Sequence, residues 1–190
     1  MDKDTPLEET MGALNQIVQS GKALYVGLSN YDGETLAKAS EILTQMHCPF
    51  IINQNRYSIF DRTIENNGLK EMAHKLNKGI IAFSPLAQGL LTDRYLKGIP
   101  EDSRIKTDGR FLKAEIFDRK KNLTQIANLN EIAKQRGQTL AQMALAWILK
   151  DNIVTSVLIG ASKPEQILMN LEAMNNIVFS SEELKLIDDK

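Results

Sequence analysis

Apolar residues along the chain alternate between helical spacing and short unbroken runs. Near the N-terminus, apolar residues three or four apart follow a hydroxyl residue and a proline, so a helix is predicted to start at Thr5, with this residue as its cap, and to end at Gly21. Four apolar, β-branched runs predict strands at 23–28, 50–53, 80–83 and 154–159. Further helices are predicted near 36–43, 69–76, 123–135 and 140–149, then from the residues after Ser162 to about Met174, and from Ser181 onward.

Strand and helix alternate four times, which is typical of a parallel α/β fold. A complete (βα)8 barrel needs about 250 residues and eight such units, so four units amount to half of a barrel. A small open doubly wound sheet fits the same number of units. The pattern alone leaves these two architectures open, within a single domain that covers residues 1–190.

A long polar stretch, from about Thr92 to Lys121, interrupts this alternation. It holds Gly98, Pro100 and Gly109 and shows little periodicity. Loops of this length are uncommon in ordered domains unless they are functional. We therefore expect this stretch to take part in the function of the protein.

Composition narrows the class of protein without indicating a chemistry. The 190 residues are 43% hydrophobic and 25% charged, which is typical of a soluble globular chain. The formal net charge is -1 with no long run of one sign, so we expect a small molecule or another protein as partner, and neither nucleic acid nor a membrane. A single cysteine, the lack of a signal-peptide pattern and the lack of a long apolar run predict a cytoplasmic protein in which Cys48 is buried.

Polar and small residues follow all four predicted strands. Ligands of parallel sheets bind at the carboxyl ends of the strands, so these residues are the candidate ligand contacts. Each group taken alone has a plainer explanation, because polar residues commonly terminate strands. The four strand ends are Ser29-Asn30, Asn53-Gln54, Ser84-Pro85-Leu86 and Gly160-Ala161-Ser162.

The last of these strand ends has the features of a phosphate site. A glycine turn after a strand, followed by Ser162 as the cap of the next helix, gathers backbone N–H groups at the positive end of that helix. Lys163 adds a cation beside them. An ordinary N-cap with a solvated lysine explains the same residues, so both interpretations stay open at this point.

The usual catalytic signals are weak in this sequence. His47 and His74 lie in or beside predicted helices, where histidines are more often surface or packing residues than bases or metal ligands. No spacing of histidine, cysteine and carboxylates predicts a metal site, and the sequence has no Gly-x-Ser-x-Gly elbow or P-loop. Trp147 shares a helical face with Leu140 and Met143 and is predicted to lie in the core.

Four ordered motifs resemble the aldo-keto reductases, and most closely the branch of the bacterial L-glyceraldehyde 3-phosphate reductases and the potassium-channel β-subunits. The resemblance covers nearly the whole chain and favours half of a (βα)8 barrel, with four parallel βα units plus extra helices, over an open sheet. In this family, reduced NADP delivers hydride to an aldehyde or ketone. The motifs are Gln54-Asn55-Arg56-Tyr57-Ser58 and the segments 83–91 (FSPLAQGLL), 140–147 (LAQMALAW) and 158–162 (LIGAS).

The resemblance implies that NADP(H)-binding residues lie at every strand end. Ser29 and Gln54, with Asn30 beside them, would hold the nicotinamide carboxamide, and Phe83 would lie against the ring. The residues that would follow the pyrophosphate are Ser84, Leu86 and Gln88, with Arg94 and Arg104 reaching it from the long polar stretch as a clamp. Those that would hold the adenosine and its 2′-phosphate are Gly160, Ser162, Lys163, Gln166 and Asn170.

Two departures from the family pattern concern the cofactor. Met169 stands where a glutamate often hydrogen-bonds the adenine amino group. Asp93 stands where a small residue is usual, next to Arg94 where a lysine is common. An acid at this place is expected to weaken pyrophosphate binding, because like charges repel.

The family's catalytic aspartate, tyrosine, lysine and histidine have no matching positions in this chain, which resembles the C-terminal half of these enzymes. We therefore expect a truncated reductase domain that does not reduce carbonyl compounds alone, with Met1 corresponding to an internal methionine of a longer ancestor. A half-barrel binding or scaffold module, which forms a homodimer through its strand edges or complements an N-terminal half, is the alternative. A reading frame that continues upstream and supplies the missing half is the third hypothesis. The substrate class in the parent family is a small carbonyl compound.

Overall fold

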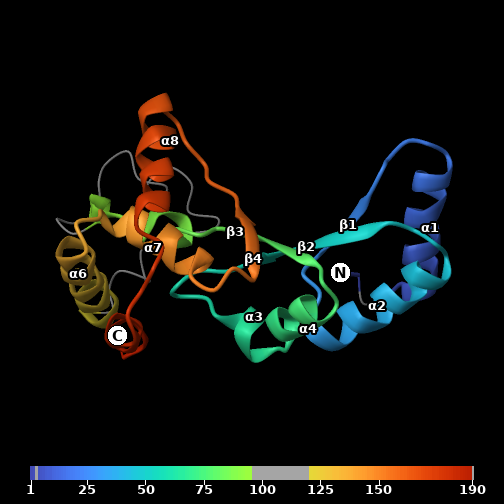
Figure 1. Ribbon diagram of the computed structural model, residues 1–190, viewed down its shortest axis with the longest axis horizontal. Coiled ribbons are helices and arrows are strands. Elements are labelled where there is room, and N and C mark those ends of the chain that lie inside the picture. The colour runs from blue at the N-terminus through green and yellow to red at the C-terminus, as the bar shows by residue number, and fades with distance from the viewer. Residues whose placement is uncertain (3, 96–119, 190) are drawn as a thin grey trace. The chain divides into compact units, whose positions relative to one another are not determined.

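The computed structural model describes residues 1–2, 4–95 and 120–189 (Figure 1). These residues form two compact units, each with buried apolar residues of its own. The first unit holds Met1–Tyr57, Asp61–Phe83 and Asp151–Leu158, without residue 3. The second holds Ser58–Phe60 and the described parts of 84–150 and 159–190. None of the helices in these described ranges is long and apolar enough to cross a bilayer.

A four-stranded parallel sheet forms the centre of the first unit and confirms the predicted parallel α/β fold. Its strands lie in the order β1-β2-β3-β4, with β1 at Val26–Ser29, β2 at Phe50–Arg56, β3 at Gly79–Phe83 and β4 at Val154–Val157. The first strand starts later than its apolar run predicts, because the ladder to β2 begins only at Val26. Leu24 and Tyr25 precede it and are 81% and 59% exposed.

Four helices accompany the sheet in the first unit, namely α1 (Leu7–Gln19), α2 (Gly33–Gln45), α3 (Thr63–Asn66) and α4 (Leu69–Lys75). α1 packs against α2, α2 against α4 and β2, and α4 against β3. The prediction that Thr5 caps the first helix is wrong. Pro6 occupies the N-cap position of α1 without a side-chain hydrogen bond, and the Thr5 hydroxyl donates instead to Asp2 Oδ2 at 2.6 Å.

The sheet buries one face and leaves the other partly exposed. Most of the buried face is apolar, and two asparagines of β2 are the polar exceptions. Asn53 Nδ2 donates to Asn55 Oδ1 at 2.5 Å, and Asn55 Nδ2 donates to the backbone oxygen of Tyr31 at 3.2 Å. Since side chains alternate along a strand, Gln54 and Arg56 lie on the opposite, partly exposed face. The buried positions of the strands are Val26, Leu28, Phe50, Asn53, Asn55, Ile80, Ala82 and Val154.

Ile52 occupies the partly exposed face between two glycines. A Cβ atom at Gly27 on β1 would lie 3.0 Å from Ile52 Cγ2. A Cβ atom at Gly79 on β3 would lie 3.1 Å from Ile52 Cδ1 and 2.9 Å from Thr155 Oγ1. The two glycines therefore leave the space that the isoleucine side chain fills.

The starts of α2 and α4 meet where two glycine backbones touch. Gly33, the first residue of α2, donates its N–H to the backbone oxygen of Asn67 at 3.1 Å. A Cβ atom at Gly33 would lie 2.4 Å from the backbone oxygen of Gly68 and 2.5 Å from its carbonyl carbon. Gly68 is the N-cap of α4 and has a left-handed φ of 74°. This approach requires glycine at position 33.

The second unit is largely helical in its described residues. Its α-helices are α6 (Lys120–Gln135), α7 (Leu140–Leu149), α8 (Pro164–Leu171) and α9 (Ser181–Asp188), and its 3₁₀ turns are η1 (Ala87–Gly89), η2 (Asp93–Tyr95) and η4 (Glu172–Asn175). The helix predicted to run to about Met174 thus changes from α to 3₁₀ after Leu171. Thr139 caps α7, and its hydroxyl accepts the Gln142 N–H at 3.2 Å. Trp147 is fully buried, which confirms its predicted place in the core.

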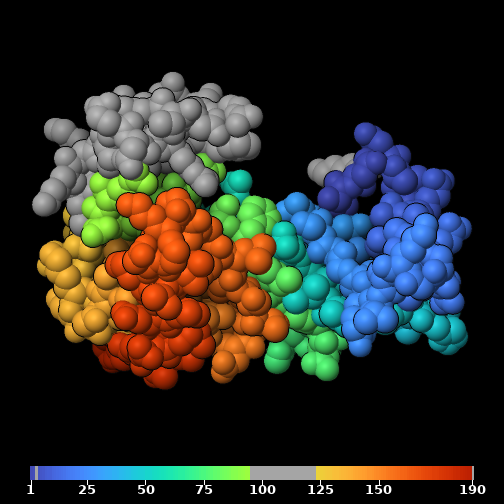
Figure 2. Space-filling model, turned by 90° about the horizontal axis from the view of Figure 1, so that it is seen from above, coloured from blue at the N-terminus to red at the C-terminus, as the bar shows by residue number. Residues whose placement is uncertain are grey.

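α8 lies on the surface of the second unit, and none of its residues is buried (orange in Figure 2). Its C-terminal end is held by a side chain of α7. Gln142 Nε2 donates to the backbone oxygen of Met169 and to Glu172 Oε2, each at 3.0 Å. The oxygen of the same amide accepts the Thr139 N–H at 2.8 Å. The LAQMALAW motif therefore attaches α8 to the start of α7.

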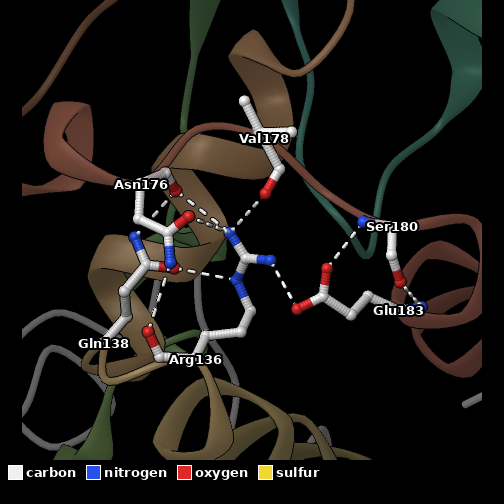
Figure 3. Close-up of polar contacts among 6 residues, drawn as sticks. All are labelled: Arg136, Gln138, Asn176, Val178, Ser180 and Glu183. Atoms are coloured by element: carbon white, nitrogen blue, oxygen red, sulfur yellow. Dashed lines mark hydrogen bonds and ion pairs between the residues drawn. The ribbon is translucent and has the colours of Figure 1, made fainter.

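Arg136 attaches the segment before α9 to the turn between α6 and α7 (Figure 3). Its side chain is 3% exposed, and its guanidinium carbon lies 3.7 Å from the centre of the Phe179 ring. Every guanidinium nitrogen donates to an acceptor. The acceptors are Gln138 Oε1 at 2.9 Å, Glu183 Oε1 at 2.7 Å, Asn176 O at 3.0 Å, Asn176 Oδ1 at 3.2 Å and Val178 O at 3.0 Å.

The Glu183 carboxylate completes this cluster and also caps α9. It accepts the Ser180 N–H at 2.7 Å, while the Ser180 hydroxyl accepts the Glu183 N–H at 3.1 Å. Burial alone would raise the pKa of Glu183, but the hydrogen bonds from the Ser180 backbone and from Arg136 outweigh it and lower the pKa below its usual value.

Candidate functional site

In the first unit, three of the predicted contact residues lie together at the carboxyl edge of the sheet. Ser29 at the end of β1 is the ladder partner of Gln54 in β2. The Ser29 hydroxyl and the Asn30 N–H both donate to the backbone oxygen of Gln54, each at 3.0 Å. Asn30 has a left-handed φ of 60°, which asparagine tolerates better than most residues. These bonds hold the strand end rigidly, while the partly exposed Gln54 side chain lies on the open face.

Phe83 lies at the same edge, at the end of β3, and is partly exposed. Its ladder partner is Arg56 of β2. The guanidinium carbon of Arg56 lies 5.9 Å from the centre of the Phe83 ring, within the range of a cation–π contact. Sequence reasoning did not single out Arg56 as a site residue, although its place two residues beyond Gln54 puts both side chains on one face of β2.

In the second unit, segment 84–89 carries an unusual concentration of left-handed backbone. Positive φ values occur at Ser84 (54°), Ala87 (47°), Gln88 (60°) and Gly89 (98°). Such conformations are costly for residues other than glycine and cluster at ligand-binding sites. Backbone hydrogen bonds inside the segment hold this conformation, because the Ala87 N–H donates to Ser84 O at 3.0 Å and the Gly89 N–H donates to Leu86 O at 2.8 Å.

Gln88 adds an unsatisfied polar atom to this segment. Its Oε1 is buried and makes no hydrogen bond to the described residues. A buried acceptor of this kind indicates a missing donor, such as a ligand hydroxyl or amide. Arg94 is exposed in η2, and Arg104 lies outside the described residues.

At the start of α8, three donors meet on one acceptor atom. Gln166 Oε1 accepts the Ser162 N–H at 2.8 Å, the Ser162 hydroxyl at 3.2 Å and the Lys163 N–H at 3.2 Å. The prediction that Ser162 caps this helix is wrong, because Lys163 occupies the N-cap position and the Ser162 hydroxyl donates rather than accepts. Gly160, Ser162, Lys163 and Gln166 are exposed and Asn170 is partly exposed, so this helix start is open to a ligand.

Comparison with known proteins identifies the family. The family model described as "Aldo/keto reductase family" matches residues 1–190. The chain belongs to the aldo/keto reductase family. An L-glyceraldehyde 3-phosphate reductase of Escherichia coli O157:H7 is 50% identical over 191 residues, which cover 99% of this chain and 55% of that protein. A putative voltage-gated potassium channel subunit beta of Schizosaccharomyces pombe is 36% identical over 193 residues, covering 99% of this chain and 56% of the relative.

A solved structure agrees with the family assignment. A thermostable aldo-keto reductase in complex with the inhibitor epalrestat has 30% sequence identity and a TM-score of 0.72, covering 99% of this chain and 56% of that structure. The chain spans about half the length of the relatives it matches. This likeness confirms the expected fold, in which four parallel βα units correspond to about half of an aldo-keto reductase barrel.

A tyrosine, a lysine and carboxylates also cluster in this aldo/keto reductase chain, and sequence reasoning missed the cluster. The Tyr57 hydroxyl donates to Glu65 Oε1, and Lys70 Nζ donates to the Tyr57 hydroxyl at 3.3 Å. Lys70 also forms an ion pair with Asp151, which is 81 positions away in the sequence. Tyr57 is fully buried, so its hydroxyl is closed to substrate and the cluster is structural.

The ionisation of Tyr57 is expected to set an alkaline limit on stability. Burial, followed by the hydrogen bond and charge of Glu65, raises the pKa of Tyr57 far above its usual value. Because the folded-state pKa is raised, this contribution is present below about pH 10 and is lost as the pH rises and the unfolded chain ionises. Urea unfolding measured between pH 8 and pH 11.5 should show that the free energy of unfolding of the wild type falls by about 1.4 kcal/mol per pH unit above roughly pH 10. The Tyr57→Phe variant should lack this fall.

The exposed Tyr25 provides the matched control, since Tyr25→Phe should keep the wild-type slope in the same titration. Equal slopes for wild type and Tyr57→Phe would show that Tyr57 ionises as easily in the folded protein as in the unfolded one.

Two other features of the described residues do not extend the site. No group of three or more histidine, cysteine, aspartate or glutamate side chains in these residues is arranged to hold a metal ion. A polar pocket in the first unit is lined by His74, Lys78, Asn152 and their neighbours. Gly79, which starts β3, also lines it, so the pocket lies at the amino ends of the strands, opposite the edge where ligands of parallel sheets bind.

Proposed function

We propose that this chain forms the NADP(H)-binding part of an oxidoreductase that reduces aldehydes or ketones to alcohols. The observation that carries the proposal is the convergence of three donors from Ser162 and Lys163 on Gln166 Oε1. The amide oxygen stands in for a phosphate oxygen, because helix starts bind anions through such N–H groups. The 2′-phosphate that distinguishes NADP(H) from NAD(H) fits this position, with Lys163 as its counter-charge. Gly160 leaves room beside it, since no atom lies within 4 Å of a Cβ placed there.

The strained segment 84–89 supports a pyrophosphate contact. Its left-handed residues are of the kind that cluster at ligand-binding sites, and the buried Gln88 Oε1 has no donor among the described residues, so a cofactor hydroxyl can supply one. We assign Ser84, Leu86, Gln88 and Arg94 to the pyrophosphate, together with Arg104. The acid at Asp93 next to Arg94 weakens this contact.

At the sheet edge, Ser29, Asn30 and Gln54 orient the nicotinamide carboxamide and Phe83 covers the ring. The cofactor supplies the hydride when it is bound. What the chain contributes is the rigid edge, because the Gln54 carbonyl already receives two hydrogen bonds and the strand cannot shift as the amide side chain engages a ligand.

The substrate class that we propose is a small phosphorylated aldehyde, by analogy with the relatives named L-glyceraldehyde 3-phosphate reductase. Reduction also needs an acid that protonates the carbonyl oxygen, and such acids contribute about 10²–10⁴-fold in rate. The buried Tyr57 does not serve this role. We therefore propose that these 190 residues bind cofactor and do not reduce carbonyl compounds alone.

The proposal is tested by titrating the purified chain with NADPH and with NADH, following quenching of the Trp147 fluorescence. Saturable binding of NADPH is expected. Lys163→Gln should weaken NADPH binding about tenfold to a hundredfold and leave NADH binding nearly unchanged, since a charge-assisted contact to the 2′-phosphate contributes about 1.5–3 kcal/mol and only NADPH carries that group.

Lys38→Gln is the control for a loss of charge, because Lys38 is exposed in α2 and pairs with the exposed Glu34. It should change neither affinity. A folded chain that binds neither dinucleotide would refute the proposed function, and an equal loss of NADPH and NADH affinity in Lys163→Gln would refute the assignment of the 2′-phosphate.

A second candidate function, a scaffold that assembles with another half-barrel, is favoured by the two outer strands. Among the described residues, β1 pairs only with β2 and β4 only with β3, so each has one unpaired edge. The exposed Leu24 and Tyr25 precede β1 and offer an apolar surface beside its edge. Such edges associate readily. Light scattering measures the oligomeric state and so distinguishes the two functions. A stable dimer supports pairing of the strand edges between two copies. A monomer that binds NADPH refutes the scaffold and supports the cofactor-binding function.

A further inference from the structure

Arg56 places a positive charge at the edge of the sheet where the nicotinamide ring is assigned. It is the ladder partner of Phe83, and its guanidinium carbon lies 5.9 Å from the centre of that ring. The side chain is 54% exposed, so it is open to a ligand that approaches the ring.

The charge of Arg56 is only loosely compensated in the first unit. The Asp61 carboxylate lies 3.9 Å from Arg56 Nε, at the outer limit of an ion pair. The same carboxylate accepts the Thr63 N–H at 3.2 Å and the Thr63 hydroxyl at 2.8 Å, which holds it at the start of α3. The guanidinium group of Arg56 therefore keeps most of its positive charge uncompensated beside the Phe83 ring.

We propose that Arg56 makes the nicotinamide site prefer the reduced cofactor to the oxidised one. The inference rests on the proposed function. The oxidised nicotinamide ring carries a positive charge and the reduced ring is neutral, so a fixed cation nearby repels only the oxidised form. For two unit charges less than one Debye length apart at a partly solvated surface, Coulomb's law gives a preference on the order of threefold to tenfold.

The preference has a consequence for the direction of the reaction. A site that releases the oxidised cofactor more readily than it releases the reduced one is suited to carbonyl reduction, because product inhibition by NADP⁺ is weakened. Arg56 acts here as a residue that sets cofactor specificity, and it takes no part in proton or hydride transfer.

The experiment measures the dissociation constants of NADP⁺ and NADPH for the wild-type chain and for variants, by isothermal titration calorimetry at low salt. Arg56→Gln should lower the ratio of the NADP⁺ constant to the NADPH constant about threefold to tenfold, mainly through tighter NADP⁺ binding. Asp61→Asn should raise the ratio, because it removes the compensating charge while the asparagine oxygen can still accept the Thr63 N–H and hydroxyl. Lys38→Gln, at an exposed lysine of α2, should leave the ratio unchanged.

Salt adds a readout that a purely structural role of Arg56 would not produce. The wild-type ratio should fall toward that of Arg56→Gln as the ionic strength rises, since exposed charges are screened. If both dinucleotides bind and Arg56→Gln keeps the wild-type ratio, the inference is wrong and the proposed function stands. If a folded wild-type chain binds neither form, the proposed function fails and the inference fails with it.

Discussion

Replacement of Arg136 by alanine is expected to lower the free energy of unfolding of the second unit by about 3–5 kcal/mol. The side chain is 3% exposed and donates to five acceptor atoms, so its removal leaves the Glu183 carboxylate and several carbonyl groups without their donors. Part-buried acceptors that lose this donor cost about 1–3 kcal/mol each, whereas the Glu183 carboxylate is 30% exposed and stays partly hydrated. Trp147, the single tryptophan of the chain, lies in the same unit and reports its unfolding in urea by fluorescence.

Lys134→Ala provides the matched control, two positions earlier in the last turn of α6. Lys134 and its partner Glu131 are 61% and 64% exposed, and such pairs contribute less than about 1 kcal/mol. At acid pH, the difference in free energy of unfolding between wild type and Arg136→Ala should become smaller. The lowered pKa of Glu183 means that its contribution is present above the usual carboxyl range and is lost as the pH falls through the lowered value. An Arg136→Ala variant as stable as Lys134→Ala would contradict the buried cluster.

Gly33→Ala should destabilise the first unit by about 3 kcal/mol or more. The new methyl carbon would lie 2.4 Å from the Gly68 carbonyl oxygen, and since a Cβ is fixed by its own backbone, no side-chain rotation can relieve the contact. Overpacking typically costs about 1–3 kcal/mol, and a clash between two helix starts lies at the upper end because α2 must separate from α4. Urea unfolding followed by circular dichroism measures the loss.

Gly12→Ala tests whether the effect belongs to the site or to the substitution. Gly12 lies inside α1, and nothing lies within 4 Å of a Cβ placed there. The same substitution should stabilise the protein by about 0.5–1 kcal/mol, because alanine favours the helix interior over glycine. Gains of similar size in both variants would contradict the close approach of the Gly33 and Gly68 backbones.

The strands and their parallel arrangement could be predicted because apolar, β-branched runs alternate with helical spacing. Their ends were less predictable, since the run at 23–28 is apolar throughout while the ladder to β2 starts at Val26. An apolar residue such as Leu24 signals a strand in the sequence whether or not a neighbouring strand pairs with it. The prediction that Thr5 caps α1 was wrong because its hydroxyl donates to Asp2, and the sequence pattern does not show which partner a hydroxyl takes.

The candidate site also has features that the sequence predicts and features that only the structure shows. The meeting of Ser29 with Gln54 followed from a rule, that carboxyl ends of parallel strands share an edge, and the ladder confirms it. The donor set at Ser162 was predicted but its acceptor was not, because the side chain of Gln166 turns back to the helix start only in three dimensions. The contact of Lys70 with Asp151 joins residues 81 positions apart, which no local pattern reveals.

Ile52 packs between Gly27 and Gly79, so the residues tolerated at these three positions, on three different strands, depend on one another. A larger residue at Gly27 needs a smaller side chain at position 52, since its methyl group would lie 3.0 Å from Ile52 Cγ2, and one at Gly79 would also meet Thr155 Oγ1 at 2.9 Å. Among homologous sequences positions 27 and 52 should therefore covary, with alanine at 27 accompanied by alanine at 52, because valine keeps the Cγ2 atom. A replacement of the glycine alone would be destabilising and therefore rare among homologues, while the paired replacement would be tolerated.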